Sequence, residues 1–413
     1  MNKAESSEIA DNLDSRGIEK TDHIMEADLV ILNTCVVRQH AENKVKSMLG
    51  YMKRIQKEKP AQRVVITGCF VEHDIKSLEK KYPLVDLFFA PGDLKSFVSW
   101  LDSQILLNHS ALTSPTIKNR SPISAYIPIM QGCNNYCSYC IVPYRRGRER
   151  SRTPNDILQQ AKESVNKGAK EIILLGQNVN SYGKGLLEQA DLTTLLAELN
   201  TIEGLHRIRF LTNHPKDMNR RLIDAIASLA KVCHHICLPL QSGDDLILER
   251  MNRNYSYDQY KSIVDELRVK VPAMSFSTDI IVGFPGETEI QFSNTYNAIR
   301  EIRYDAVHVA AYSPREQTAA SKNYEDDVLY EIKQQRLHQI EQLQKAMLTE
   351  INNRLLNSTV EVLVEGKKGI KWYGRTYNDK LVFIESGEDL FGELVRVKIS
   401  TVTPWSLQGS IVS

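Results

Sequence analysis

The sequence predicts an α/β protein with three parts: a doubly wound N-terminal domain, a (β/α)6 partial TIM barrel core and a small C-terminal β-barrel. Three observations point to this fold. Short apolar runs alternate with amphipathic helical stretches as far as about residue 350. Short alternating strands with glycine turns follow them. The length of 413 residues also exceeds what one ordinary core accommodates and suits two or three domains.

The first part, residues 1–110, alternates short β-rich apolar runs with helical stretches. We expect strands at Ala27–Asn33, Arg63–Thr67 and Asp86–Ala90, and helices at Ala41–Lys57 and Ile75–Lys80. Strands that alternate with helices favour a parallel, doubly wound sheet. Residues 108–124 are rich in Ser, Thr and Pro and are predicted to form a linker.

The second part, residues 119–350, contains six strand–helix units. The expected strands are Tyr126–Met130, Glu171–Leu175, Arg207–Leu211, Ile236–Leu240, Ser275–Val282 and Ala306–Tyr312. The expected helices are Pro154–Lys167, Leu192–Asn200, Met218–Ala230, Tyr257–Val271, Thr288–Ile302 and Asp326–Leu356. Thr153 is a candidate N-cap for the first helix, which ends at Gly168. Six units predict a (β/α)6 partial barrel, because a full (β/α)8 barrel needs two more.

The third part, residues 351–413, changes to short strands with glycine turns. The expected strands are Val360–Val364, Trp372–Thr376, Leu381–Glu385, Leu394–Ser400 and Ser406–Ile411. Five short strands in about sixty residues favour a small β-barrel.

The bulk composition is that of an ordinary globular protein, with 42% hydrophobic and 25% charged residues. The net charge of +1 leaves local patches, rather than a basic surface, for any nucleic-acid contact. We find no run of eighteen apolar residues and no apolar signal segment in Met1–Lys20, so we expect a cytoplasmic protein without a membrane span. In that compartment seven cysteines indicate metal or catalytic thiols rather than disulfides.

Three of these cysteines, Cys133, Cys137 and Cys140, follow the first core strand with the spacing Cys-x3-Cys-x2-Cys. One loop with this spacing can place three thiolates on three irons of a 4Fe-4S cluster and leave the fourth iron without a protein ligand. An open iron can chelate S-adenosylmethionine (SAM) and lead to a 5′-deoxyadenosyl radical. Tyr139 can pack beside the adenine of SAM. The alternative is a structural zinc site, but zinc closes with four ligands and the sequence offers no fourth nearby.

The chain resembles the radical SAM tRNA methylthiotransferases of the MiaB type over essentially its whole length. The most specific motif is CNNYCSYCIVPYRRGRERSR from Cys133. Further matches are LLGQNVNSYG at 174–183, HPKDM at 214–218, LPLQSGDD at 238–245, STDIIVGFPGETE at 277–289 and AAYSPREQTAA at 310–320. The family architecture has an N-terminal methylthiotransferase domain, a radical SAM core and a C-terminal TRAM domain, which fit residues 1–110, 119–350 and 351–413.

The resemblance implies addition of a methylthio group to C2 of N6-isopentenyladenosine next to the anticodon of tRNA. It implies two SAM molecules, one as methyl donor and one as radical source. It also implies an electron donor such as flavodoxin or ferredoxin, a sulfur donor and a monomeric enzyme that recognises the tRNA anticodon stem-loop.

The family also has an auxiliary 4Fe-4S cluster with three N-terminal cysteines, of which Cys35 and Cys69 match here. Both follow predicted strands, whose carboxyl ends converge in a doubly wound sheet. Without the family, small buried thiols would be an equal reading. The first family cysteine would precede Met1, together with a first strand. We therefore expect a misplaced start or a shortened chain, with a poorly bound auxiliary cluster.

Several polar residues lie at the ends of predicted core strands, where barrel ligands bind. The resemblance makes this face the SAM site, and the candidates are Gln177, Asn178, Gln241, Ser242 and Asp279. The alternative is that these side chains cap loops. Cys233 and Cys237 flank two histidines, but their apolar surroundings favour structural thiols over a metal site.

Two basic segments are candidates for RNA contact. The arginine run beside the cysteine loop contains Arg145, Arg146, Arg148, Arg150 and Arg152. Such a run is as often a solvated loop, but arginine can bind the tRNA backbone and stack on splayed bases. In the third part, lysines alternate with aromatic residues, which suits RNA binding: Lys367, Lys368, Lys371, Trp372, Tyr373 and Arg375.

Three functional hypotheses follow. The first is the tRNA enzyme described above. The second keeps its chemistry but acts on a different modified adenosine or on a ribosomal protein. The third is a zinc-stabilised RNA-binding protein without catalysis, which would be colourless and would not cleave SAM.

Overall fold

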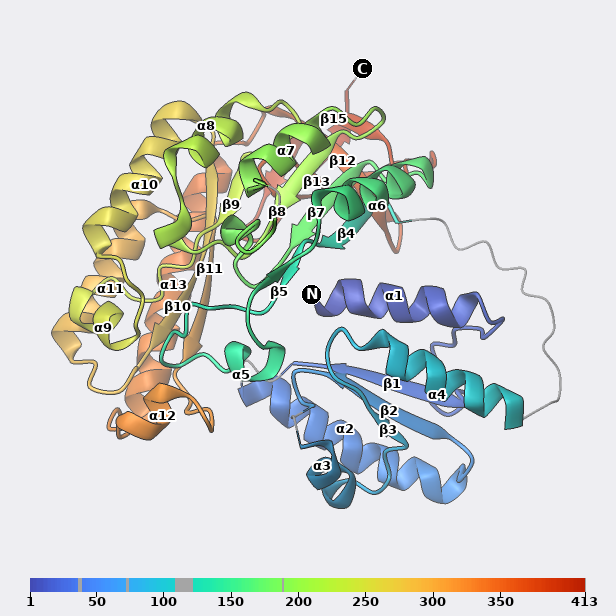
Figure 1. The fold of residues 1–413 in the computed structure, drawn as a ribbon. Coiled ribbons are helices and arrows are strands. Elements are labelled where there is room, and N and C mark those ends of the chain that lie inside the picture. Colours follow the sequence, from blue (N-terminus) through green and yellow to red (C-terminus); the bar gives the residue numbers. More distant parts are fainter. Residues whose placement is uncertain (36–38, 72–73, 108–121, 188, 413) are drawn as a thin grey trace. The chain divides into compact units, whose positions relative to one another are not determined.

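A computed structural model describes residues 1–35, 39–71, 74–107, 122–187 and 189–412 and divides the chain into two compact units (Figure 1). The first unit is Met1–Arg120 with Cys140–Arg148, and the second is Ser121–Tyr139 with Glu149–Ser413. The predicted linker over 108–124 lies outside the described residues as far as residue 121.

The first unit is a parallel three-stranded sheet with helices on both faces. Its strands lie in the order β1 (Leu29–Thr34), β2 (Arg63–Gly68) and β3 (Leu87–Phe88). Its helices are α1 (Asn2–Asp14), α2 (Gln39–Glu58), α3 (Ile75–Lys81), α4 (Leu94–Leu107) and α5 (Val142–Arg146). Since neighbouring side chains on a strand point to opposite faces, Val64 and Ile66 pack with α2, whereas Val65 packs with α1 and α4. Helices α1, α4 and α5 are additions to the elements predicted from the sequence.

The core of the second unit contains six parallel strands, as predicted. They form two three-stranded sheets, β4-β7-β8 and β9-β10-β11. The two sheets meet through Cys233, whose N–H donates to the Ile208 carbonyl at 2.9 Å. The strands are β4 (Ser124–Pro128), β7 (Glu171–Leu175), β8 (Arg207–Phe210), β9 (His235–Cys237), β10 (Ser275–Val282) and β11 (Ala306–Ala311). Strand β9 is shorter than predicted, because Pro239 has no N–H to donate to a ladder.

Helices cover the outside of this partial barrel (Figure 1). They are α6 (Pro154–Asn166), α7 (Leu192–Asn200), α8 (Arg220–Ser228), α9 (Asp245–Arg250), α10 (Tyr257–Lys270), α11 (Glu289–Ile302), α12 (Ala319–Asn323) and α13 (Tyr330–Asn353). The predicted N-cap of α6 is confirmed, because the Thr153 side chain accepts from the Asp156 N–H. The short pair β5 (Met130–Gln131) and β6 (Arg150–Ser151) and the 3-10 turns Val179–Ser181 and Pro215–Asp217 complete the core.

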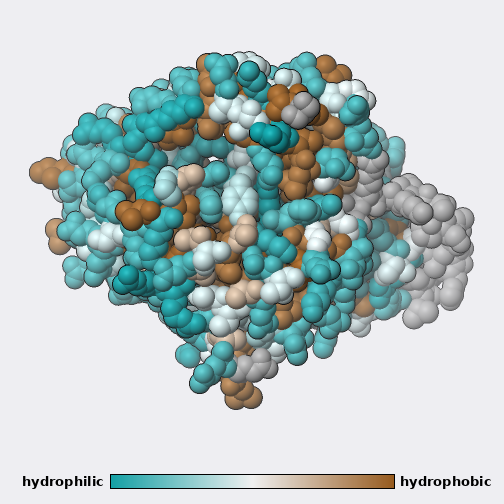
Figure 2. Space-filling model, turned by 90° about the horizontal axis from the view of Figure 1, so that it is seen from above, coloured by the Kyte–Doolittle hydropathy of each residue, from teal (hydrophilic) through white to brown (hydrophobic). Residues whose placement is uncertain are grey.

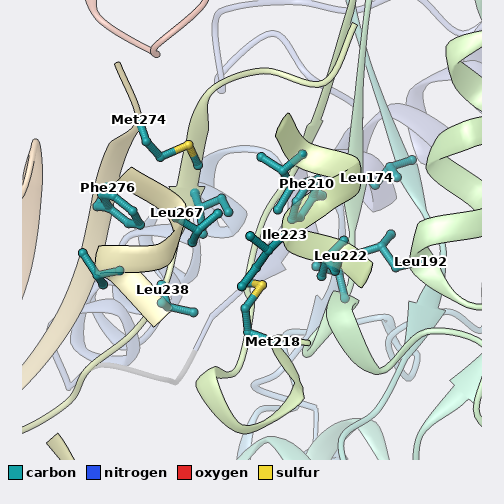
Figure 3. Packing of buried hydrophobic residues seen from close by; sticks show 14 of the residues in the cluster. Leu174, Leu192, Phe210, Met218, Leu222, Ile223, Leu238, Leu267, Met274 and Phe276 are labelled. Carbon is teal, nitrogen blue, oxygen red and sulfur yellow. The ribbon is translucent and has the colours of Figure 1, made fainter. Parts of the chain in front are cut away.

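The apolar faces of these helices and strands form one large cluster. Figure 3 shows Leu222 and Ile223 of α8 beside Phe210 of β8. Leu238, which follows β9, and Phe276 of β10 extend the same cluster over the neighbouring sheet. Burying this many apolar side chains supplies most of the stability of the unit and fixes the positions of the strand ends.

The C-terminal part is a closed five-stranded barrel, as predicted, in the order β12-β13-β14-β16-β15. Its strands are β12 (Thr359–Lys368), β13 (Lys371–Thr376), β14 (Leu381–Glu385), β15 (Leu394–Val402) and β16 (Leu407–Ile411). Every second residue points inward, so that Val362, Trp372, Val382 and Ile384 form its core.

This barrel packs on the amino-terminal ends of the core strands. Arg207 and Arg209 are the first and third residues of β8 and donate to the carbonyls of Arg375 at 2.6 Å and Thr376 at 2.8 Å. Ser275, the first residue of β10, donates to the Asn378 carbonyl at 2.9 Å. The C-terminal barrel therefore covers the amino-terminal ends of the core strands. The cysteine loop lies at the opposite end of the core, near the carboxyl ends of the strands.

No helix in the described ranges combines the length and the apolar character needed to cross a bilayer. Hydrophilic residues make up most of the face seen in Figure 2, with hydrophobic residues in separate groups.

Candidate functional site

The cysteine loop begins directly after β5. Gly132 has a φ of 80°, and its N–H donates to the Gln177 side-chain oxygen at 2.6 Å. Gln177, predicted as a SAM contact, thus anchors the start of the loop. Cys133 and Cys137 belong to the second unit, and Cys140 is the first residue of the segment Cys140–Arg148 that belongs to the first unit.

The turn that follows α9 holds the middle of this loop. The Ser138 N–H donates to the Met251 carbonyl at 2.9 Å, and the Ser138 hydroxyl donates to the Arg250 carbonyl at 2.8 Å. The Asn252 amide donates to the Tyr136 carbonyl at 3.0 Å. Sequence reasoning missed this turn. Its only local signal is asparagine, which adopts left-handed backbone more readily than most residues and has a φ of 57° at Asn252.

The same turn ends in a buried arginine that contacts a cysteine of the loop. Arg253 is 4% exposed, and one of its terminal nitrogens donates to Cys137 Sγ at 3.3 Å. Its Nε donates to the Tyr255 hydroxyl at 2.9 Å, and its other terminal nitrogen donates to the Pro239 carbonyl at 3.1 Å. In the part of the chain that the structure describes, no carboxylate forms an ion pair with Arg253.

The donors at this loop fit an iron–sulfur cluster. Cys133 and Cys137 are half-buried thiols, and burial raises the pKa of Cys133 above its usual range. A raised pKa favours the neutral thiol, whereas a bound metal cation would favour the thiolate, which is the form that ligates metal. Among the described residues, no three His, Cys, Asp or Glu side chains are close enough to hold one metal ion. A cubane keeps its ligands farther apart than one ion does, because several irons lie between the sulfurs.

Of the other predicted SAM contacts, Asn178, Gln241 and Ser242 lie beyond the carboxyl ends of β7 and β9 and make internal contacts. Asp279 was predicted at a strand end but lies within β10, where it pairs with His308 of β11. The Asn178 amide donates to Asp217 at 2.8 Å, and the Ser242 hydroxyl lies 3.2 Å from that of Thr295. Gln241 has a φ of 70°, its N–H donates to the Asp279 carbonyl at 2.9 Å, and its buried side-chain oxygen has no partner among the described residues.

Tyr139 packs partly buried against an apolar cluster of Ile247, Met251, Phe284, Tyr312 and Ala320. Tyr139 therefore lies in apolar surroundings, between Cys137 and Cys140 of the cysteine loop.

A group of charged residues at the same end of the core was not singled out from the sequence. Burial, with help from Arg253 and Lys216, lowers the pKa of His214 to about 2, so that its imidazole is neutral. Burial also raises the pKa of Glu149. At Asp217 burial acts to raise the pKa, but hydrogen bonds from Asn178, Lys184 and Lys216 outweigh it and lower the pKa. In the sequence, only the motif HPKDM at 214–218 pointed to His214 and Asp217 as members of this group.

In the first unit, Cys35 and Cys69 directly follow β1 and β2. The Cys69 N–H donates to the Thr34 carbonyl at 3.0 Å, which brings the two strand ends together. A side chain at Gly68 would collide with the Thr34 backbone, and its φ of 88° also favours glycine. Burial raises the pKa of Cys69, the positive charge of Arg146 opposes this rise, and the nearby Cys35 adds to it.

The structure corrects the expected role of one arginine. Arg146 was predicted to contact RNA, but its side chain is 3% exposed and forms an ion pair with Glu5 at 2.7 Å. It also donates to the Asn2 side chain at 3.1 Å. A guanidinium held in this way inside the first unit cannot reach a phosphate. Arg148 and Arg150 are exposed, and Arg145 is half-buried.

A second correction concerns Trp372, which was predicted to stack on RNA bases. The ring is 6% exposed and belongs to the core of the C-terminal barrel. The exposed Lys367 lies over it with its ammonium 4.9 Å from the ring centre. Lys371 pairs with Glu385 at 3.0 Å and donates to Gln408 at 2.9 Å.

Cys233 and Cys237 agree with their prediction as structural thiols. Burial raises the pKa of Cys233 to about 12 and that of Cys237 to about 11, so both are neutral.

Comparisons with known proteins cover nearly all of the chain. Residues 1–90 match the Uncharacterized protein family UPF0004, residues 127–299 the Radical SAM superfamily and residues 353–412 the TRAM domain. A protein of Dehalococcoides mccartyi named tRNA-2-methylthio-N(6)-dimethylallyladenosine synthase is 47% identical over 412 residues, which cover 100% of this chain and 96% of that protein. A protein of the same name from Acetivibrio thermocellus is 42% identical over 100% of this chain and 89% of its own length.

Solved structures give the fold. The radical S-adenosylmethionine methyltransferase TsrM from Kitasatospora setae, solved with tryptophan and a SAM analogue, aligns with a TM-score of 0.51. The alignment covers 72% of this chain and 64% of that one at 14% identity, which indicates a shared fold.

Proposed function

Because the chain belongs to the family of the tRNA-2-methylthio-N(6)-dimethylallyladenosine synthases, we propose that it adds a methylthio group to C2 of N6-isopentenyladenosine next to the anticodon of tRNA. The observation that carries the proposal is the 47% identity over the whole chain. The Cys-x3-Cys-x2-Cys loop at the carboxyl end of the core strands agrees with it.

Cys133, Cys137 and Cys140 hold the 4Fe-4S cluster of the radical SAM core in this proposal. When bound, that cluster supplies the electron that cleaves SAM to a 5′-deoxyadenosyl radical. The chain's own residues shape the loop: Gln177 anchors its start at Gly132, and the turn after α9 holds its middle. Asn178, Gln241, Ser242 and Asp279 would bind SAM, and Tyr139 would pack beside its adenine.

Cys35 and Cys69 would contribute ligands to the auxiliary 4Fe-4S cluster, which would supply the sulfur for the methylthio group. Their placement at two adjacent strand ends supports this assignment. Arg146 supplies positive charge next to the Cys69 thiol. An external sulfur donor replaces the sulfur that is used.

The tRNA anticodon stem-loop contacts the exposed arginines Arg148 and Arg150, the half-buried Arg145, and Lys367 and Lys371 on the C-terminal barrel. Lysine and arginine bind the backbone by charge, and arginine can also stack on unpaired bases. We place the reaction in the cytoplasm, with a monomeric enzyme reduced by a low-potential donor such as flavodoxin or ferredoxin.

The test is anaerobic reconstitution of the chain with iron and sulfide, followed by incubation with SAM, reductant and isopentenylated tRNA. We expect a brown protein, 5′-deoxyadenosine as product and a methylthio-isopentenyl base in the digested tRNA, in an amount that follows the occupancy of the auxiliary cluster. Cys137→Ala should lose SAM cleavage, whereas the matched control Cys233→Ala, at a buried structural thiol, should keep it.

Other outcomes identify the alternatives. A colourless protein that holds zinc and leaves SAM intact would mean a non-catalytic RNA-binding protein. Methylthiolation of another adenosine, or of a ribosomal protein, would keep the chemistry and change the substrate.

A further inference from the structure

Arg253 differs from the other buried arginines in the groups that accept its hydrogen bonds. Four of them face a carboxylate: Arg146 at 2.7 Å from Glu5, Arg207 at 3.2 Å from Glu361, Arg209 at 2.7 Å from Glu171 and Arg336 at 2.8 Å from Glu287. Arg253 is equally buried, and within the described residues its three donors go to a phenol, a carbonyl and Cys137 Sγ. A cation in the interior is stable only with an anion nearby. The Cys137 sulfur, which accepts from Arg253 at 3.3 Å, would carry that negative charge as an iron ligand.

We propose that Arg253 is a positioning residue for the core cluster, which binds the Cys137 thiolate and makes the cluster easier to reduce. This inference rests on the proposed function, because it requires that Cys137 ligates iron.

The turn Arg250–Arg253 supports this role by geometry. Its backbone carbonyls accept hydrogen bonds from Ser138, and its Asn252 side-chain amide donates to the Tyr136 carbonyl, so one turn holds the loop on both sides of Cys137. Arg253 is therefore fixed relative to Cys137 before any cluster binds. A hydrogen bond from a preorganised donor to a ligand sulfur is one of the features that set cluster potentials.

The direction of the effect follows from charge. Reduction by one electron from the external low-potential donor adds a negative charge beside Cys137, and no bond forms or breaks in this step. A fixed positive charge stabilises the reduced state more than the oxidised state, and the buried setting weakens the screening by solvent. Removal of the charge should lower the midpoint potential.

The experiment is an anaerobic redox titration of the reconstituted full-length protein, followed by the electron paramagnetic resonance signal of the reduced cluster. Cys35 and Cys69 are replaced by Ala in every sample, so that only the core cluster contributes. In Arg253→Gln we expect the ratio of reduced to oxidised cluster at a fixed potential to fall about tenfold, which is 59 mV for one electron. In Arg253→Lys, which keeps the charge, the midpoint potential should fall by less than half of that amount.

Two controls separate charge from packing. Arg268→Gln removes an arginine that lies over the Phe276 ring at 5.2 Å, in the same core, and should leave the potential unchanged. Asn252→Ala removes a hydrogen bond to the loop without changing its charge, and should lower iron retention but not the potential.

The outcomes distinguish this inference from the function on which it rests. A parent protein that binds no iron would overturn the proposed function. An iron-loaded Arg253→Gln variant with the parent potential would overturn the role of Arg253 alone. The remaining case is an Arg253→Gln variant that holds no iron at all. In that case a folded Gln variant, together with iron binding in Arg253→Lys, supports the role of Arg253. An unfolded Gln variant, or a Lys variant that also binds no iron, overturns that role.

Discussion

Arg209 and Glu171 form an ion pair of 2.7 Å inside the second unit, with both side chains less than 5% exposed. Glu171 is the first residue of β7 and Arg209 the third residue of the neighbouring β8, and Arg209 also donates to the Thr376 carbonyl of the C-terminal barrel at 2.8 Å. One buried arginine thus joins two strands of the core to the domain that packs on them.

Replacing Glu171 with Ala should destabilise the second unit by about 3–5 kcal/mol, because it leaves the Arg209 charge buried without its partner. Urea unfolding measures the change. The matched control is Arg221→Ala, which breaks an exposed pair with Asp191 and should cost about 1 kcal/mol or less. Equal losses in the two variants would show that burial does not govern the Arg209–Glu171 pair.

His214 should make the stability of the second unit depend on pH. Its folded-state pKa of about 2 lies below the unfolded value of 6.5. As the pH falls below 6.5, the unfolded chain therefore binds a proton that the folded chain does not, and stability is lost. Between pH 7 and pH 5 the free energy of unfolding of the parent should fall by about 2 kcal/mol more than that of His214→Asn. Parallel urea-unfolding curves for the two proteins over this range would contradict the neutral imidazole.

The arginine run should divide into structural and RNA-binding members. Arg146→Met should destabilise the first unit by about 3–5 kcal/mol, because it strands the buried Glu5 carboxylate. Arg148→Met, at an exposed position, should leave stability within about 0.5 kcal/mol. It should also weaken tRNA binding and reduce the salt slope by about 1. Thermal unfolding and filter binding at several salt concentrations measure the two effects, and a reversal of the two phenotypes would contradict the assignment.

The two tryptophans of the C-terminal barrel should also differ. Trp372→Ala empties part of the barrel core and should cost about 3–5 kcal/mol in urea unfolding. Trp405 is 59% exposed, and Trp405→Ala should cost about 0.5 kcal/mol or less. A stable Trp372→Ala variant with reduced RNA affinity would return Trp372 to the role predicted from the sequence.

The auxiliary cysteines should separate the two halves of the reaction. Cys69→Ala should abolish methylthiolation of tRNA while SAM cleavage to 5′-deoxyadenosine continues, because the core cysteines are intact. Chromatography of the nucleosides measures both products. Cys233→Ala, at a buried structural thiol, is the control and should retain both activities.

Much of the fold follows from local pattern. The alternation of apolar runs with helices gave all three strands of the first unit, all six parallel strands of the core and all five of the C-terminal barrel. The short helices α5, α9 and α12 were missed, because five or six residues carry too little periodicity to stand out from a loop.

The sequence by itself determined the parts of this protein that depend on spacing along the chain: the cysteine loop, the strand periodicity and the family they indicate. Only the tertiary structure decided which charges are buried. Arg146 and Arg148 are neighbours in one motif, yet one is held by Glu5 and the other is exposed. Arg253 meets Cys137 across 116 residues of sequence. Burial and partnership are set by contacts between distant segments, which no local pattern records.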